Sequence, residues 1–219
     1  MNNNKMIVRL SIVAGLAILA MFAVTVFTGV SQEKFENVLD AGVYARELIA
    51  EQGPLRLIFT IDFVFIAVFT TVFVILPQSL KTGSPVVNGI ANLSIGAMVL
   101  CGLLDFVEDL HILTMLDSAN KGLALADSQI ALQAFLSALK FCASYVSLFA
   151  LAFILPSRTI PEKLIRYSLW FFQLPVGALV YTAPHDYRLL FGLMRFAFMI
   201  TGFFLLAYNF SRAEAEESF

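Results

Sequence analysis

The sequence predicts an all-α integral membrane protein, a bundle of six transmembrane helices with one amphipathic interfacial helix between the first two. Hydrophobic residues make up 59% of the chain and charged residues only 14%, whereas a soluble domain carries about 25% charged residues. The mean hydropathy is +0.84. Apolar stretches long enough to cross a bilayer recur along the chain. They occupy most of the 219 residues, so we expect a single polytopic domain over 1–219.

The first expected span covers 10–30, directly after the basic residues Lys5 and Arg9. A basic start followed by an apolar run also describes a secretory signal peptide. This run is longer than the usual core of a signal peptide, and no convincing cleavage site of small residues follows it. We therefore expect a retained transmembrane helix.

The segment 32–52 is expected to be the interfacial helix. It carries apolar side chains at helical spacing with charged residues between them, and it is too polar to cross a membrane. Such a segment lies with its apolar face in the headgroup region. Ser31 is the expected N-cap, with Glu33 in the first turn, and Gly53-Pro54 is expected to end the helix.

Five further spans follow, and prolines mark several of their ends. The third apolar stretch is too long for a perpendicular crossing at 1.5 Å per residue, so this helix either tilts or projects from the membrane. Pro175 interrupts the fifth expected span. The five spans are expected at 55–76, 86–116, 129–155, 167–183 and 189–208.

Lysine and arginine are distributed in a way that favours a cytoplasmic N-terminus. With the N-terminus inside, the inner segments hold seven of these residues and the outer segments hold five. Basic residues concentrate on the cytoplasmic side of membrane proteins. We therefore expect a plasma (inner) membrane protein whose interfacial helix is external.

Several ionisable residues lie inside the expected spans. A charged side chain at the bilayer centre costs about 2.5–3.5 kcal/mol on insertion scales, so such residues tend to face a protein interior or a water-filled cavity. The second span contributes one carboxylate, the third an acidic run with a histidine, and the fourth and sixth one cation each. These residues are Asp62, Asp105, Glu108, Asp109, His111, Lys140 and Arg195.

Helical periodicity gathers polar or small residues on one face of three of these helices. In the third span the face comprises Ser94, Met98, Cys101, Asp105, Glu108, Asp109 and Ile112. In the fourth it comprises Gln133, Ser137, Lys140, Ser144 and Ser147. In the sixth it comprises Arg188, Gly192, Arg195, Met199 and Gly202. We expect all three faces to turn inward and meet.

The charges do not balance in this arrangement. Four carboxylates face two fixed cations, Lys140 and Arg195, and most of the acidic residues lie towards the outer ends of their spans. A buried charge without a partner is protonated, solvated or paired with an external cation. The leading hypothesis is an outward-facing acidic cavity that binds or transports a proton, a cation or a small cationic or amphiphilic ligand. All seven ionisable residues are its expected binding groups, and His111 is the expected proton relay.

A membrane-embedded enzyme acting on a lipid or quinone is the second hypothesis. Glu108 and His111 have the i, i+3 spacing that places two metal ligands on one helical face, and Asp105 and His185 could complete a divalent metal site. The cofactor is left open. Haem is disfavoured because one histidine lies in a span and the other in a loop. No residue is assigned as catalytic, and no familiar hydrolase, zinc-protease or nucleotide-binding motif occurs.

Simpler interpretations exist for each feature. The acidic run could mark the point where the third helix leaves the membrane, and Lys140 and Arg195 could be structural counter-ions between helices. The chain could also be an accessory subunit whose polar faces bind partner membrane subunits, or form a homo-oligomer. Besides the lipid bilayer, the expected partner is therefore a small molecule, a cation or another membrane subunit. The net charge of −2 offers no basic surface for nucleic acid.

Overall fold

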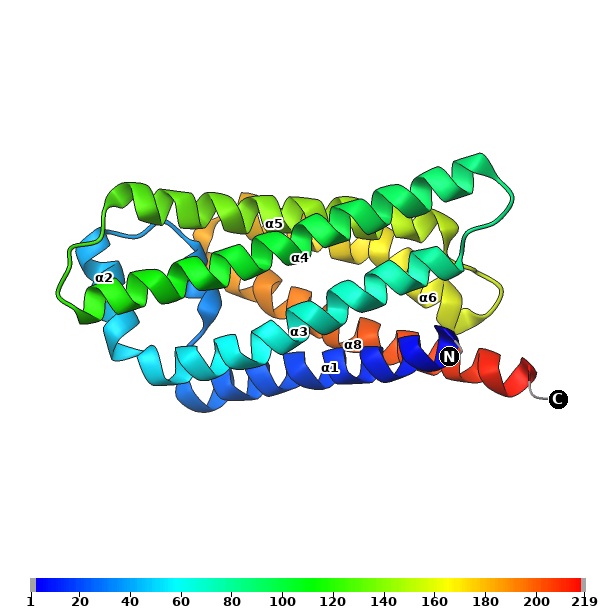
Figure 1. Cartoon of the computed structure of the whole chain (residues 1–219), viewed down its shortest axis with the longest axis horizontal. Coiled ribbons are helices and arrows are strands. Elements are labelled where there is room, and N and C mark those ends of the chain that lie inside the picture. Colours follow the sequence, from blue (N-terminus) through cyan, green and yellow to red (C-terminus); the bar gives the residue numbers. More distant parts are fainter. Residues whose placement is uncertain (1–2, 218–219) are drawn as a thin grey trace.

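The computed structural model describes residues 3–217, except for the side chains of 185, 186, 188, 189 and 213–217. The described chain is helical, and long helices run side by side along the length of the bundle (Figure 1). Five of the described helices are long and apolar enough to cross a membrane. They are α1 (Asn3–Thr28), α3 (Gln52–Ser79), α4 (Pro85–Asn120), α5 (Asp127–Ile154) and α8 (His185–Glu217), of which Leu190–Arg212 is the apolar part.

These helices extend beyond the apolar stretches that predicted them, because the helical backbone continues into the polar ends of each segment. The third expected span is the extreme case. At 1.5 Å per residue, the 36 residues of α4 reach about 54 Å. Figure 1 shows α4 running the full length of the bundle and packing between α3 and α5.

The two ends of the bundle differ in what they carry. Both chain termini lie at one end, together with the loop between α3 and α4 (Figure 1). The opposite end carries the 3-10 helix η1 (Gln32–Glu36) and the short helix α2 (Ala41–Ala50). We call this second end the capped end.

The expected fifth span is not one regular helix. The structure divides it into α6 (Ile160–Ser168), the π-helix η2 (Leu169–Gln173) and α7 (Leu174–Thr182). Pro175 has no backbone N–H, so a regular helical hydrogen bond cannot form there, and the wide turn of η2 precedes it. Neither α6 nor α7 is long enough to cross a bilayer alone. The six regular spanning helices of the sequence interpretation therefore become five, with one composite helical segment.

The expected interfacial helix over 32–52 is also divided. Residues 37–40 are not helical, and Asp40 starts α2 by accepting a hydrogen bond from the Val43 amide at 3.0 Å. Three of its large apolar side chains, Phe35, Tyr44 and Leu48, are fully buried in the bundle. The Tyr44 hydroxyl donates to the Phe35 carbonyl at 2.9 Å and ties the two short helices together. The expectation of a single helix was wrong because η1 ends at Glu36 and Asp40 then starts a second helix as its N-cap.

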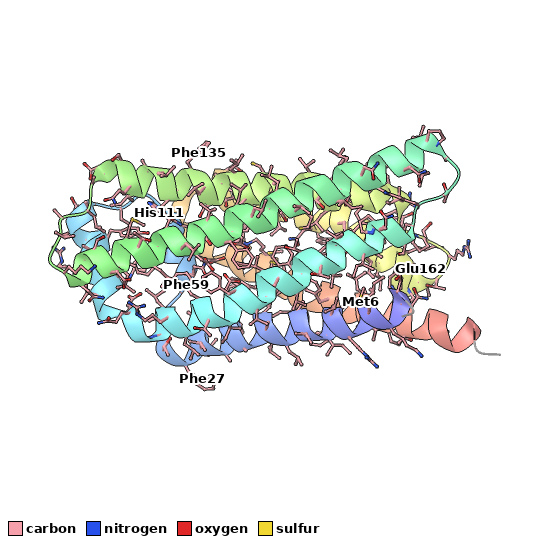
Figure 2. The ribbon with its side chains drawn as sticks, viewed as in Figure 1. Met6, Phe27, Phe59, His111, Phe135 and Glu162 are labelled. Atoms are coloured by element: carbon pink, nitrogen blue, oxygen red, sulfur yellow. The ribbon has the colours of Figure 1, made fainter. Side chains whose placement is uncertain are left out.

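The core and the outer surface are both apolar, as a lipid-facing protein requires. Phe27 and Phe135 point away from the bundle, with 88% and 61% of their surface exposed, whereas Phe59 is buried among the helices (Figure 2). Polar contacts lock α4 against α5, because Ser94 and Ser147 each donate to the other's carbonyl, at 3.0 and 2.8 Å. The apolar exterior supports an integral membrane protein.

Candidate acidic binding site

The polar face of α4 lies inside the bundle. All seven residues of the face that the sequence predicts, from Ser94 to Ile112, are buried. Glu108 and Asp109 have no exposed surface, and Asp105 is 7% exposed. The acidic run therefore does not mark a helix end standing in water.

Lys140 on α5 is the cation at the centre of the acidic group. Its ammonium lies 2.8 Å from Asp105 Oδ1 and 3.6 Å from Glu36 Oε1, and it is also paired with Glu108. Its side chain is only 6% exposed. One buried ammonium is thus shared among three carboxylates that come from α4 and η1.

Glu108 is held by the polar face of α5 on its other side. The Gln133 side chain donates to Glu108 Oε1 at 3.1 Å, and the Ser137 hydroxyl donates to the same oxygen. Gln133 in turn contacts His111 Nδ1 through its own side-chain oxygen at 2.8 Å. The side-chain amide of Gln133 therefore connects His111 to the acidic group. His111 itself is half-buried and lies at the edge of that group.

The short helix η1 brings three polar side chains that sequence reasoning did not assign to the site. Gln32 donates to Asp109 Oδ1 at 2.8 Å, Glu33 pairs with Arg195, and Glu36 faces Lys140. The only sequence signal was the apolar Phe35 between them, which the interfacial interpretation assigned to lipid and which the structure buries fully. In the structure these side chains place the segment as a cap over the acidic end of the bundle.

Arg195 on α8 connects η1 to the helices of the bundle. Its guanidinium donates to Glu33 and lies over the Phe141 ring, 4.1 Å from the ring centroid, which is a cation–π contact. Burial raises the pKa of Glu33 above its ordinary value, and the positive charge of Arg195 opposes part of that rise. The ion pair thus keeps a half-buried carboxylate in contact with its cation.

Three aspartates form a compact carboxylate group. Asp62 on α3 and Asp105 and Asp109 on α4 each offer an oxygen, and these atoms lie within 4.8 Å of one another. Asp62 is 7% exposed and has no hydrogen bond or ion pair with any described residue. No described group donates to Asp109 Oδ2 either. We call these three residues the aspartate triad.

The site carries excess negative charge. Within the site itself, six described carboxylates meet two cations. The carboxylates are Glu33, Glu36, Asp62, Asp105, Glu108 and Asp109, and the cations are Lys140 and Arg195. Buried carboxylates without counter-ions bind protons or cations, so this site is suited to either.

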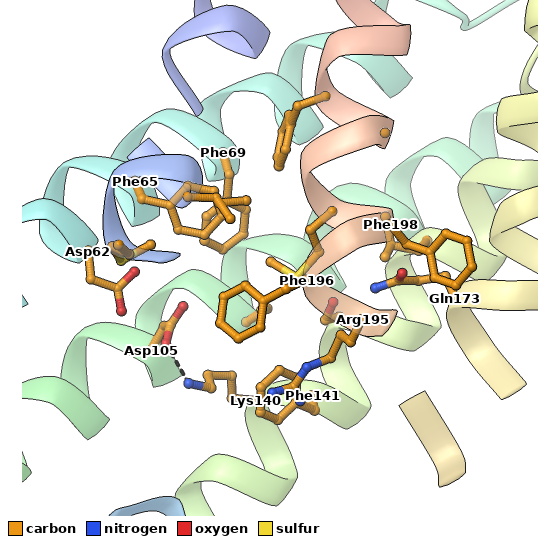
Figure 3. Close-up of a pocket in the computed structure, with 18 of the residues that line it drawn as sticks. Asp62, Phe65, Phe69, Asp105, Lys140, Phe141, Gln173, Arg195, Phe196 and Phe198 are labelled. Atoms are coloured by element: carbon orange, nitrogen blue, oxygen red, sulfur yellow. Dashed lines mark hydrogen bonds and ion pairs between the residues drawn. The ribbon is translucent and has the colours of Figure 1, made fainter. Parts of the chain in front are cut away.

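A cavity of about 180 Å³ adjoins the site (Figure 3). Asp62, Asp105, Lys140 and Arg195 line one part of it. Away from these groups the lining becomes apolar and aromatic, with residues of α3 and α8 contributing most of it. This apolar lining includes Phe65, Phe69, Phe73, Phe196, Phe203 and Leu206.

The structure therefore brings together most of the residues that the sequence singled out. Asp62, Asp105, Asp109, Glu108 and Lys140 lie in one group, Arg195 joins it through η1, and His111 lies at its edge. The expected metal ligands are arranged differently, since Glu108 contacts Lys140 and His111 contacts Gln133. The side chain of His185 lies outside the described residues.

When it is compared with protein-family models, curated proteins and solved structures, the chain gives no match.

Proposed function

We propose that this protein binds and transports a proton or a small cation through the acidic cavity. The observation that carries the proposal is Asp62, a carboxylate 7% exposed that lines the cavity and has no hydrogen-bond or ion-pair partner among the described residues. Ionisable residues inside a membrane protein usually mark an ion or proton pathway. Asp105 and Asp109 lie beside Asp62 and extend the negative surface.

We also propose six crossings, with α6, η2 and α7 together forming the fifth. This composite segment returns the chain towards the capped end, and both termini then lie at the opposite end, as an even number of crossings requires (Figure 1). With the N-terminus in the cytoplasm of a plasma-type membrane, the capped end faces outward. The acidic cavity would then load from outside.

The other ionisable groups have distinct roles in this proposal. Lys140 neutralises part of the charge and holds Asp105 and Glu108, which leaves Asp62 as the carboxylate free to bind. His111, half-buried at the edge of the site and in contact with Gln133, is the proposed proton relay between the exterior and the acidic group. Arg195 holds η1 over the cavity.

Replacing Asp62 with asparagine is expected to lower proton or cation flux into proteoliposomes by at least about tenfold, equivalent to 1.4 kcal/mol. Asparagine has the shape of aspartate but cannot carry the negative charge that attracts the ion. The measurement is uptake driven by an imposed pH gradient, with a pH-sensitive dye inside the vesicles, and in parallel thallium uptake. The variants Asp105→Asn and Glu108→Gln are expected to reduce the flux as well.

Asp117→Asn is the matched control. Asp117 lies near the end of α4 at the capped end, but its side chain is 57% exposed and pairs with Arg56 on the surface. Its flux should equal that of the original protein. Equal flux in Asp62→Asn and Asp117→Asn, both correctly folded, would contradict the transport proposal.

A metal-dependent membrane enzyme acting on a lipid or quinone is the second candidate, and the aspartate triad favours it. Three carboxylate oxygens within 4.8 Å are hard ligands suited to Mg²⁺ or Mn²⁺ rather than zinc. We expect Mn²⁺, added to the purified protein, to give a bound electron paramagnetic resonance signal that Asp109→Asn weakens by about tenfold.

The control for metal binding is His111→Ala. His111 does not belong to the aspartate triad, so its loss should leave the Mn²⁺ signal unchanged. A signal that disappears in His111→Ala and persists in Asp109→Asn would instead favour the site of Glu108, His111 and Asp105. No bound Mn²⁺ in the original protein would remove this candidate.

A further inference from the structure

We infer that the cavity binds a single-chain amphiphilic amine, with its ammonium group against Asp62 and Asp105 and its alkyl chain along the aromatic lining. This inference rests on the proposed function, because it names the class of cation that the acidic site accepts. It is carried by a different observation, which is the division of one cavity into a charged part and an apolar part.

The charged part can accept one more cation. Lys140 already pairs with Asp105, and Arg195 pairs with Glu33. Asp62 has no such partner among the described side chains, and its carboxylate points towards that of Asp105 (Figure 3). An ammonium placed between these two aspartates would supply the missing donor for Asp62 and satisfy a buried charge.

The apolar part favours an occupant that carries an alkyl chain beside its charge. Beyond Asp62 the helix α3 contributes Phe65, Phe69 and Phe73 at intervals of three or four residues, so these rings follow one another along the cavity. From Asp62 to Phe73 the helix rises about 16 Å at 1.5 Å per residue. A hydrated metal ion would gain nothing from this lining, whereas an alkyl chain would bury its surface there.

The volume limits the length of that chain. At roughly 30 Å³ for each water-sized group, a cavity of about 180 Å³ holds about six such groups. Hexylammonium, with six carbons and one nitrogen, is close to this size. A two-chain lipid is too large, and the expected occupant is therefore an amine such as hexylammonium.

The test is saturable binding of radiolabelled hexylammonium to the full chain in lipid nanodiscs, with empty nanodiscs subtracted. Hexylammonium is expected to bind at least about tenfold more tightly than methylammonium, which lacks the chain, and than hexanol, which lacks the charge. Asp62→Asn should weaken hexylammonium binding by a similar factor. Equal binding of hexylammonium and hexanol would overturn the inference.

A pair of methionines on α8 provides a control for the chain. Met199 lines the cavity, whereas Met194, also half-buried, is not among the described lining residues. Met199→Trp should fill the cavity and abolish hexylammonium binding, and Met194→Trp should leave it intact. Binding that survives Met199→Trp would show that the chain lies elsewhere and would overturn the inference.

Failure of this inference can be distinguished from failure of the proposed function. If methylammonium and hexylammonium bind equally, and Asp62→Asn still abolishes ion flux, the acidic site binds cations but the apolar cavity does not select an alkyl chain. If Asp62→Asn changes neither binding nor flux, both the inference and the proposed function are wrong.

Discussion

Replacing Lys140 with methionine is expected to destabilise the folded protein by about 3–5 kcal/mol, the usual cost of removing one partner from a buried ion pair. Methionine keeps the unbranched apolar stem, one atom shorter than lysine, but leaves Asp105, Glu108 and Glu36 without their shared ammonium. The carboxylates would then have to take up protons in order to stay buried. The measurement is the free energy of unfolding in mixed micelles, by denaturant titration at neutral pH.

A second change should restore part of the loss. Glu108→Gln in the Lys140→Met background removes a carboxylate that has lost its cation, and the coupling energy between such neighbours is about 0.5–3 kcal/mol. Lys34→Met is the matched control, because Lys34 is 37% exposed and pairs with Glu47 and Glu51 near the surface. Its loss should cost less than about 1 kcal/mol. Equal costs for Lys140→Met and Lys34→Met would show that the buried pairing is not a source of stability.

The inward faces of the helices could be predicted from the sequence because helical periodicity fixes them. In a lipid environment the outer positions must be apolar, so the polar positions of α4 and α5 stand out against them. Asp105, Glu108 and Lys140 fall on these stripes, and the structure places them in contact. Sequence reasoning could therefore identify which positions of each helix face the interior.

The contribution of η1 could not be predicted in the same way. Glu33 and Glu36 lie in a polar segment whose helical spacing fits an interfacial helix as well as a cap over the bundle. Only the three-dimensional path of residues 37–40, which ends η1 before α2 begins, directs these side chains to Arg195 and Lys140. Long-range pairs such as Gln32 with Asp109 leave no local signal in a single sequence.

The composite fifth segment shows a related limit. Pro175 indicated an irregularity, but the sequence did not distinguish a kink from a π-helical turn, because both relieve the missing hydrogen bond of a proline. The structure places the π-helix η2 at Leu169–Gln173 and puts Gln173 in the cavity lining. The π-helix η2 thus directs the polar side chain of Gln173 towards the cavity.

The second large effect is expected at Arg195. Replacing it with methionine should release η1 and increase the rate at which Cys101 reacts with a cationic, membrane-impermeant thiosulfonate reagent by about tenfold or more. A hydrogen bond to a charged group contributes about 1.5–3 kcal/mol, and Glu33 is partly exposed, which favours the lower end of that range. Cys101 is 4% exposed and lines the cavity one turn from Asp105, so it reports access from the capped end.

The labelling is done in a Cys142→Ser background, because Cys142 is exposed on the surface of the bundle. Glu33→Gln removes the other charge of the pair and should accelerate labelling in the same way. Arg56→Met is the control, since it breaks an exposed ion pair with Asp117 at the same end of the bundle and should leave the rate unchanged. If Arg195→Met and Glu33→Gln both label as slowly as the original protein, their ion pair does not hold the cap, and access to the acidic cavity must be controlled elsewhere.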